Sequence, residues 1–253
     1  MVNLYDIKLM IGFRREMPLI TETQVIHKLI ESKELLIFDF DGVLADSVEV
    51  KTDAFSKLYK SYGEDVVSKV VNHHRMNGGM SRFEKFKHYH HAYLGLTIDD
   101  KQLLELSEQF SALVINAVIA SFEVPGVTFF LQNYCVNNKK CIINSATPQN
   151  EIYQIVEERG MVQYFSNIYG SPSTKYENLN SALSDHHLGN KEALFFGDAD
   201  SDLKASYRAN VDFIGVGNVM NSLLSNSSRR HYHIKDFRDI NDEIAEIQQV
   251  SFE

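Results

Sequence analysis

The residues best suited to chemistry in this sequence are two aspartates, Asp39 and Asp41, separated by one residue. The four apolar residues at 35–38 precede them and predict a buried strand. On an extended backbone residues i and i+2 point to the same side, so both carboxylates would face one spot beyond the strand end. Gly42 follows and allows a sharp turn. Such a pair can hold a divalent cation, and one acid can attack while the other moves a proton.

Further polar groups follow other apolar stretches. The segment 139–148 contains a second predicted strand that ends in hydroxyl groups, among them Ser145. Pro148 suits the first turn of a helix. The free backbone N–H groups at such a helix start attract anions. Lys175 opens another helical pattern. The apolar run 193–197 leads into Gly-Asp-x-x-x-Asp, which contains Asp198 and Asp202.

In this order the four segments resemble the four motifs of the haloacid dehalogenase (HAD) superfamily over roughly residues 34–240. The resemblance implies that Asp39 is a nucleophile that forms an aspartyl-phosphate. It also implies that Asp41 protonates the leaving oxygen and then deprotonates water. Ser145 would bind the transferring phosphoryl group and Lys175 would neutralise it. The cofactor implied is Mg²⁺, held by Asp39, the Asp41 carbonyl and Asp198, with Asp202 as a neighbouring group or alternative ligand.

The composition is that of an ordinary globular protein. The chain has 253 residues, 44% of them hydrophobic and 23% charged, with a net charge of −9. The acidic balance argues against a nucleic-acid partner, because such partners require a basic face. No apolar run reaches the ~20 residues of a membrane span. The two cysteines, Cys135 and Cys141, are interpreted as buried thiols, and a cytoplasmic location is the default expectation.

Alternating strand and helix patterns predict an α/β fold. Their order favours a doubly wound, Rossmann-like parallel sheet with helices on both faces. In such sheets a site lies beyond the carboxyl ends of the strands, where all four motifs fall. The predicted strands are 35–39, 141–145, 167–170, 193–197 and 212–216, and the predicted helices include 149–159, 175–187 and 201–209.

The chain is divided into an extension, a core and an insertion. Residues 1–33 form an N-terminal extension with one helix, opened by a capping box at Thr21 and Gln24. That helix is expected to pack on the core or on a partner subunit, and a homodimer is left open. Residues 34–48 and 125–253 form the α/β core. Residues 49–124 interrupt the alternation, and the resemblance implies a small α-helical cap there, hinged near 47–50 and 122–126.

One loop of the insertion is the candidate for contacts with the rest of the substrate. Gly79 allows close backbone approach, and Ser81 can cap the helix that begins with Arg82. The loop is similar to the cap loop of β-phosphoglucomutase and its relatives, in which a Ser-Arg pair grips an anion. Ala146 and Thr147, beside Ser145, are also assigned to substrate binding. The alternatives are an exposed Arg82 at a helix start and, for Lys85, a solvated charge.

Other features receive structural interpretations. The histidines His88, His90 and His91 lack the companion ligands of a transition-metal site. Aromatic residues recur at steps of three and four over 83–93, as expected of the buried face of a helix. Ser228-Arg229-Arg230 is interpreted as a solvated loop.

The sequence therefore predicts a Mg²⁺-dependent phosphatase acting on a small soluble phosphate monoester. A phosphosugar mutase with the same acids is the first alternative. A non-catalytic binding protein on a HAD fold is the second, and the intact set of acids and Lys175 argues against it. Dehalogenation is disfavoured, because dehalogenases of the family lack an acid that matches Asp41.

Overall fold

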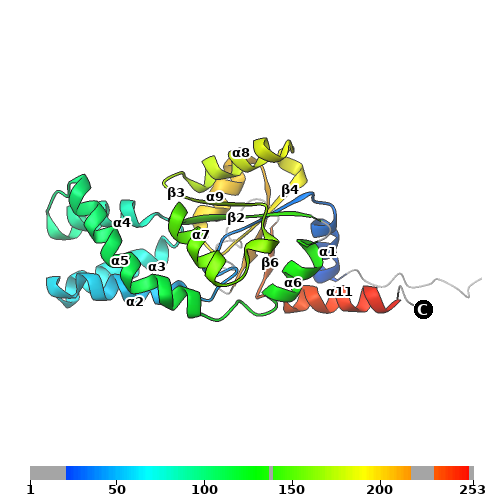
Figure 1. Cartoon of the computed structure of the whole chain (residues 1–253), viewed down its shortest axis with the longest axis horizontal. Coiled ribbons are helices and arrows are strands. Elements are labelled where there is room, and N and C mark those ends of the chain that lie inside the picture. The colour runs from blue at the N-terminus through cyan, green and yellow to red at the C-terminus, as the bar shows by residue number, and fades with distance from the viewer. Residues whose placement is uncertain (1–20, 137–138, 218–230, 251–253) are drawn as a thin grey trace, which may run out of the picture.

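A six-stranded sheet forms the centre of the protein (Figure 1). The computed structural model describes residues 21–136, 139–217 and 231–250. The strand order is β3-β2-β1-β4-β5-β6, and every pairing is parallel. The strands are β1 (Leu35–Phe38), β2 (Lys140–Pro148), β3 (Asn167–Ser171), β4 (Ala193–Gly197), β5 (Asp212–Val216) and β6 (Tyr232–Ile234).

Helices cover both faces of this sheet, so the predicted α/β, doubly wound fold is confirmed. Strand β1 shows how: Leu35 and Ile37 point into the cluster under α8 and α9, and Leu36 and Phe38 into the larger cluster on the other face. All four are fully buried. The covering helices are α1 (Glu22–Glu31), α6 (Val127–Tyr134), α7 (Gln149–Glu158), α8 (Lys175–His186), α9 (Asp200–Ala209) and α11 (Arg238–Val250).

The predicted elements are found with small shifts at their ends. The capping box at Thr21 and Gln24 is present and opens α1, which packs against α11. Strand β2 is longer than predicted, with an irregularity after Asn144. Strand β6 and helices α6 and α11 were not predicted. Residues 1–20 of the extension and the loop at 228–230 lie outside the described residues.

The interpretation of the cysteines as thiols is wrong. Cys135 and Cys141 form a disulfide with a Cα–Cα distance of 5.6 Å. It joins the end of α6 to the start of β2, two elements that the chain brings together within six residues. Their apolar surroundings were correctly read, but composition alone does not show that the two sulfurs face each other.

Four helices form a lobe beside the sheet, and we call residues 48–120 the helical lobe (Figure 1). They are α2 (Val48–Tyr59), α3 (Glu64–Met76), α4 (Arg82–Tyr89) and α5 (Asp100–Ala120). Aromatic rings fill the lobe, and the predicted aromatic face of α4 is part of this core. Helix α5 is apolar and long enough to cross a membrane by length and composition alone, but it packs on α2, α4 and α7.

Two short stretches connect the lobe with the sheet. They lie side by side, since the Asp46 N–H donates to the Phe122 carbonyl at 2.9 Å and the Val124 N–H donates to the Leu44 carbonyl at 3.2 Å. The loop after β1 therefore reaches both the carboxyl end of the sheet and the base of the lobe. This arrangement places the segment 39–47 where the two parts of the molecule meet.

Candidate active site

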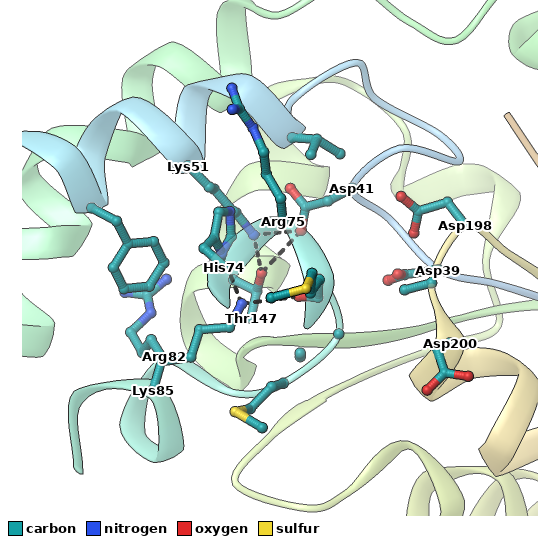
Figure 2. Close-up of a pocket in the computed structure, with 18 of the residues that line it drawn as sticks. Asp39, Asp41, Lys51, His74, Arg75, Arg82, Lys85, Thr147, Asp198 and Asp200 are labelled. Carbon is teal, nitrogen blue, oxygen red and sulfur yellow. Dashed lines mark hydrogen bonds and ion pairs between the residues drawn. The ribbon is translucent and has the colours of Figure 1, made fainter. Parts of the chain in front are cut away.

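Three aspartates meet at the carboxyl ends of the two central strands. Asp39 follows β1, Asp198 follows β4, and Asp202 lies in the first turn of α9. One carboxylate oxygen from each lies within 4.8 Å of those of the other two. Figure 2 shows Asp39 and Asp198 turned toward each other at one side of a cavity. The sequence predicted this grouping, because neighbouring parallel strands end at the same edge.

Burial and nearby acids change the protonation of Asp39 and Asp198. Burial raises the pKa of Asp39 to about 7, with Asp202 and Asp41 adding to the effect and Lys175 opposing it. Burial and the neighbouring Asp39 raise the pKa of Asp198 well above its usual value. Like charges this close repel each other unless a cation lies between them. The cluster therefore favours a bound cation.

Lys175 supplies one positive charge to this cluster. It is the first residue of α8, which is held by a capping box between Thr174 and Glu177. Its Nζ donates to Asp39 Oδ2 at 2.6 Å and also to Asp202 Oδ1. Burial alone would lower the pKa of Lys175, but the two carboxylates raise it instead. Lys175 is therefore charged at neutral pH, as its predicted role requires.

The remaining oxygens fit a hard divalent cation. Asp39 Oδ1 accepts a hydrogen bond from the Phe40 N–H at 2.6 Å, and Asp202 Oδ2 accepts one from the Ala199 N–H at 3.1 Å. No lysine or arginine in the described part of the chain pairs with Asp198. Carboxylate oxygens are the ligands that Mg²⁺ prefers. The donor set thus suits the predicted ion, with Asp198 the acid most in need of it.

The Asp41 carboxylate faces away from the three clustered acids. It accepts hydrogen bonds from Ser47 Oγ at 2.6 Å and from Lys51 Nζ, and Lys51 also donates to Thr147 Oγ1 at 2.8 Å. Burial acts to raise the pKa of Asp41, but Lys51 and Ser47 together hold it below its usual value. Only the backbone carbonyl of Asp41 stays a predicted metal ligand, because its side chain is used elsewhere.

Lys51 was missed by the sequence analysis. It lies on α2, in the helical lobe, and reaches across to an acid of the sheet. Its position one helical turn after Ser47 was the available signal, since residues i and i+4 of a helix share one face. A lysine in a charged, amphipathic helix is ordinarily interpreted as solvated, so that signal was weak.

The second predicted motif also lies at this edge. Ser145 is buried at 1% exposure, and its Oγ accepts a hydrogen bond from the Thr147 N–H at 3.1 Å. Ala146 and Thr147 line a cavity of about 670 Å³ that also contains Asp39, Asp41 and Asp198. The opposite wall of the cavity comes from the helical lobe. Polar groups of both parts therefore face the same space.

The predicted glycine loop of the lobe lies directly on the sheet's acidic end. A Cβ atom on Gly79 would lie 1.9 Å from Ser201 Oγ and 3.3 Å from Lys175 Nζ. A Cβ atom on Gly78 would lie 3.5 Å from Ala199 Cβ, an ordinary van der Waals distance. A side chain at position 79 would therefore push the lobe away from the acids. Ser81 caps α4 as predicted, in a capping box with Glu84, which occupies its hydroxyl group.

Arg82 does not have the predicted free guanidinium. Its Nη1 donates to Glu151 Oε2 at 2.9 Å and its Nη2 donates to Glu151 Oε1 at 2.5 Å, with Ser111 bonded to the same pair. Both charged residues are buried. Glu151 lies on α7 of the core, so this contact joins lobe and core. An acid distant in sequence, which the motif could not reveal, takes the place of the predicted substrate anion.

Lys85 is not the solvated charge that the sequence suggested. Only 2% of it is exposed, and it lines the same cavity as Asp41 and Thr147. Its place one turn after Ser81 puts it on the inner side of α4, together with Phe86 and Tyr89 of the lobe's core. Periodicity identified the aromatic residues of this face and overlooked the lysine among them.

Comparison with known proteins gives the family. The model of the haloacid dehalogenase-like hydrolases matches residues 36–216, and the chain belongs to that family. A search of curated proteins finds no match.

Solved structures share the fold. A putative β-phosphoglucomutase from Bacteroides vulgatus is 15% identical, with a TM-score of 0.70 over 90% of this chain and 97% of that one. A β-phosphoglucomutase from Clostridium difficile is 20% identical, with a TM-score of 0.68 over 87% and 98%. A predicted phosphoglycolate phosphatase from Haemophilus somnus is 16% identical, with a TM-score of 0.62 over 86% and 99%. At these identities the likeness establishes the fold.

The close approach of Gly42 to Asp198 leads to a first prediction. A Cβ on Gly42 would lie 2.2 Å from Asp198 Oδ2. We expect Gly42→Ala to displace that carboxylate and to weaken Mg²⁺ binding about tenfold or more, measured by calorimetric titration. Gly63→Ala is the matched control, because Gly63 also has a positive φ (93°) but no atom within 4 Å of the new methyl group. It should lose about 1 kcal/mol of stability and keep its Mg²⁺ affinity; equal affinities in both variants would contradict the prediction.

A second prediction concerns the contact between lobe and core. Glu151→Gln leaves the buried Arg82 without its counter-charge, which should lower the free energy of unfolding by about 3 kcal/mol. Urea unfolding measures the loss. Glu157→Gln, exposed on the same helix, should change it by less than about 0.5 kcal/mol. Equal stability of the two variants would show that the pair does not hold the lobe.

Proposed function

We propose that this protein is a Mg²⁺-dependent phosphatase that hydrolyses a small phosphate monoester. The observation that carries the proposal is the position of Asp39, whose Oδ2 lies 2.6 Å from Lys175 Nζ at the end of a cavity shared with Asp41 and Asp198. Membership in a family of hydrolases supports it. So do folds shared with proteins named as phosphatases and phosphomutases.

In the proposed reaction Asp39 attacks the phosphorus atom. The ester P–O bond breaks, an aspartyl-phosphate forms, and the leaving oxygen takes a proton from Asp41. Lys175 offsets charge on the phosphoryl oxygens, and Ser145 donates to one of them. Mg²⁺, held by Asp39, the Asp41 carbonyl and Asp198 with Asp202 beside them, would supply further charge stabilisation.

Water completes the proposed cycle. It attacks the phosphorus atom of the aspartyl-phosphate and gives a proton to Asp41. The bond between phosphorus and the Asp39 oxygen breaks, which frees the carboxylate and releases phosphate. The contact with Lys51 favours the charged form of Asp41, which is the form that accepts this proton. For the first step Asp41 must hold a proton. The negative charge of an arriving phosphoryl group supports that step, because a nearby anion raises the pKa of a carboxyl group.

The helical lobe is proposed to act as a cap, with domain limits of 49–124 for the cap and 34–48 plus 125–253 for the core. The contact of Gly79 with the sheet's acidic end supports this role, since a cap excludes water from a reactive phosphoryl group. Thr147 and Ala146 would contact the substrate from the core side. Ser81 and Arg82 would act by holding α4 in place.

A phosphosugar mutase is the alternative function. The same acids would then return the phosphoryl group to the sugar, and two of the similar folds belong to proteins named as β-phosphoglucomutases. Release of free phosphate from a sugar phosphate distinguishes hydrolysis from transfer.

The location is proposed to be cytoplasmic, although the Cys135–Cys141 disulfide is more typical of oxidising compartments.

Asp39→Asn tests the nucleophile. The amide cannot form the acyl-phosphate, so we expect turnover of p-nitrophenyl phosphate with Mg²⁺ to fall by about 10⁴-fold or more. The fold should remain, because the variant removes a charge from a crowded cluster. Asp46→Asn, exposed in the same loop, should keep full activity. Substantial turnover by Asp39→Asn would overturn the assignment.

Lys175→Ala tests the neutralising charge. Its loss removes one fixed positive group from the phosphoryl site, and kcat should fall by about 10²–10³-fold. Lys204→Ala is the control, because Lys204 is exposed on the neighbouring α9 and pairs only with Asp200. A decrease of only a few-fold would mean that Lys175 does not face the phosphoryl group.

A further inference from the structure

We propose that Lys85 and His74 form a second anion-binding subsite, which receives a carboxylate or second phosphate on the leaving group of the substrate. The inference rests on the proposed phosphatase function and names the class of ester that this site takes. Figure 2 shows Lys85 joined to His74 in the cavity, with Asp39 and Asp198 at the opposite side of the view. The two ends of one cavity would thus bind the two ends of one substrate.

The first argument is the burial of an ammonium group without a carboxylate. Lys85 is 2% exposed, and its Nζ contacts His74 Nδ1 at 2.8 Å and the Gly78 carbonyl at 3.3 Å. The ring of Phe55 lies 5.5 Å away. All of these partners are neutral. A buried charge without a counter-charge is costly, and proteins retain one chiefly where a ligand completes the pair.

The other cations of the cavity wall are already neutralised. Lys51 pairs with Asp41, Arg75 with Glu49, and Arg82 with Glu151. Within the described lining of this cavity, Lys85 is therefore the lysine or arginine that lacks an acidic partner. Burial and the nearby Lys51 lower the pKa of Lys85 to about 7, with Asp41 opposing. An anion that enters at this place would favour its charged form.

His74 adds a directed donor. Burial and the neighbouring Lys85 lower its pKa to about 3, so the ring is neutral. Nδ1 accepts the hydrogen bond from Lys85, which places the ring proton on Nε2. That nitrogen is buried, and the Val48 backbone interacts with the ring without completing a hydrogen bond of normal geometry to Nε2. A buried donor that is not fully satisfied is unfavourable, and an anionic oxygen in the cavity would satisfy it.

The spacing indicates a short leaving group. Lys85 Nζ lies 3.3 Å from the carbonyl of Gly78, and the adjacent Gly79 places its Cβ position 3.3 Å from Lys175 Nζ. Backbone dimensions between those two atoms limit the separation of the two ammonium groups to at most about 11 Å. A phosphoryl group at Lys175 and a second anion at Lys85 are therefore only a few bonds apart.

Binding of stable analogues tests the subsite without turnover. We would titrate the Mg²⁺-loaded protein with 3-phosphonopropionate, with propane-1,3-bisphosphonate and with propylphosphonate, which lacks the second anion. The wild-type protein should bind one or both of the probes with anionic groups at both ends at least about tenfold more tightly than propylphosphonate. Such a factor corresponds to the free energy of one charged hydrogen bond. The better of the two identifies carboxylate or phosphate as the second group.

Lys85→Met should remove this preference, so that the affinities for the three probes agree within about twofold. Lys87→Met, exposed on the same helix, should retain it. The melting temperature of Lys85→Met should equal or exceed that of the wild type, because a buried unpaired charge has been replaced by an apolar chain. A preference that survives in Lys85→Met, or that is missing from the wild type, overturns the subsite.

Turnover separates this inference from the function on which it rests. If the wild type hydrolyses ethyl phosphate and 2-phosphoglycolate with equal kcat/KM, the protein is a phosphatase without this subsite. If it hydrolyses no ester but shows a Lys85-dependent preference among the probes, the subsite stands and the proposed function is wrong. If the protein is a phosphatase and also has this subsite, Lys85→Met should lose about tenfold or more in kcat/KM for 2-phosphoglycolate and little for ethyl phosphate.

Discussion

The main physical constraint on this structure is the repulsion among three carboxylates, which the central strands bring to one edge of the sheet. The adjacent parallel strands β1 and β4 end at the same edge of the sheet. Asp39 and Asp198, which follow them, therefore lie close together. Lys175 compensates part of their charge, and the pKa of both acids stays raised. A fold that tolerates such a cluster needs a bound cation to balance its negative charge. The chemistry proposed here supplies one, Mg²⁺.

Charge also determines how the helical lobe meets the sheet. Lys51 reaches Asp41 from α2, and Arg82 reaches Glu151 from α4. On the far side Arg159 of the core donates to the carbonyls of Val118, Ile119 and Ser121 at the end of α5. These contacts are directional and polar. Contacts of this kind fix the orientation of the lobe relative to the sheet, because charge-assisted hydrogen bonds are geometrically specific.

Much of the core was predictable, because its signals are local. An apolar run followed by an acid is visible in the sequence, and the positions of Asp39, Ser145, Lys175 and Asp198 at the sheet edge follow from strand alternation. The contacts that were missed depend on how the fold orients side chains. The Cys135–Cys141 disulfide and the Lys51–Asp41 pair join residues six and ten apart, and others join distant segments. Arg82 and Glu151 are 69 residues apart, and neither carries a local sign of its partner. Lys85 was misinterpreted for the same reason, since whether a lysine is solvated depends on what the fold places over it.

Lys51 shows that the lobe and the sheet are not independent modules. The lobe supplies the cation that sets the charge state of an acid belonging to the sheet. Exchanging residues 48–120 for the corresponding segment of a relative would therefore alter the charge state of Asp41 as well as the shape of the cavity. A change in the lobe during evolution would therefore change two properties at once. These are the lining of the cavity and the pKa of Asp41.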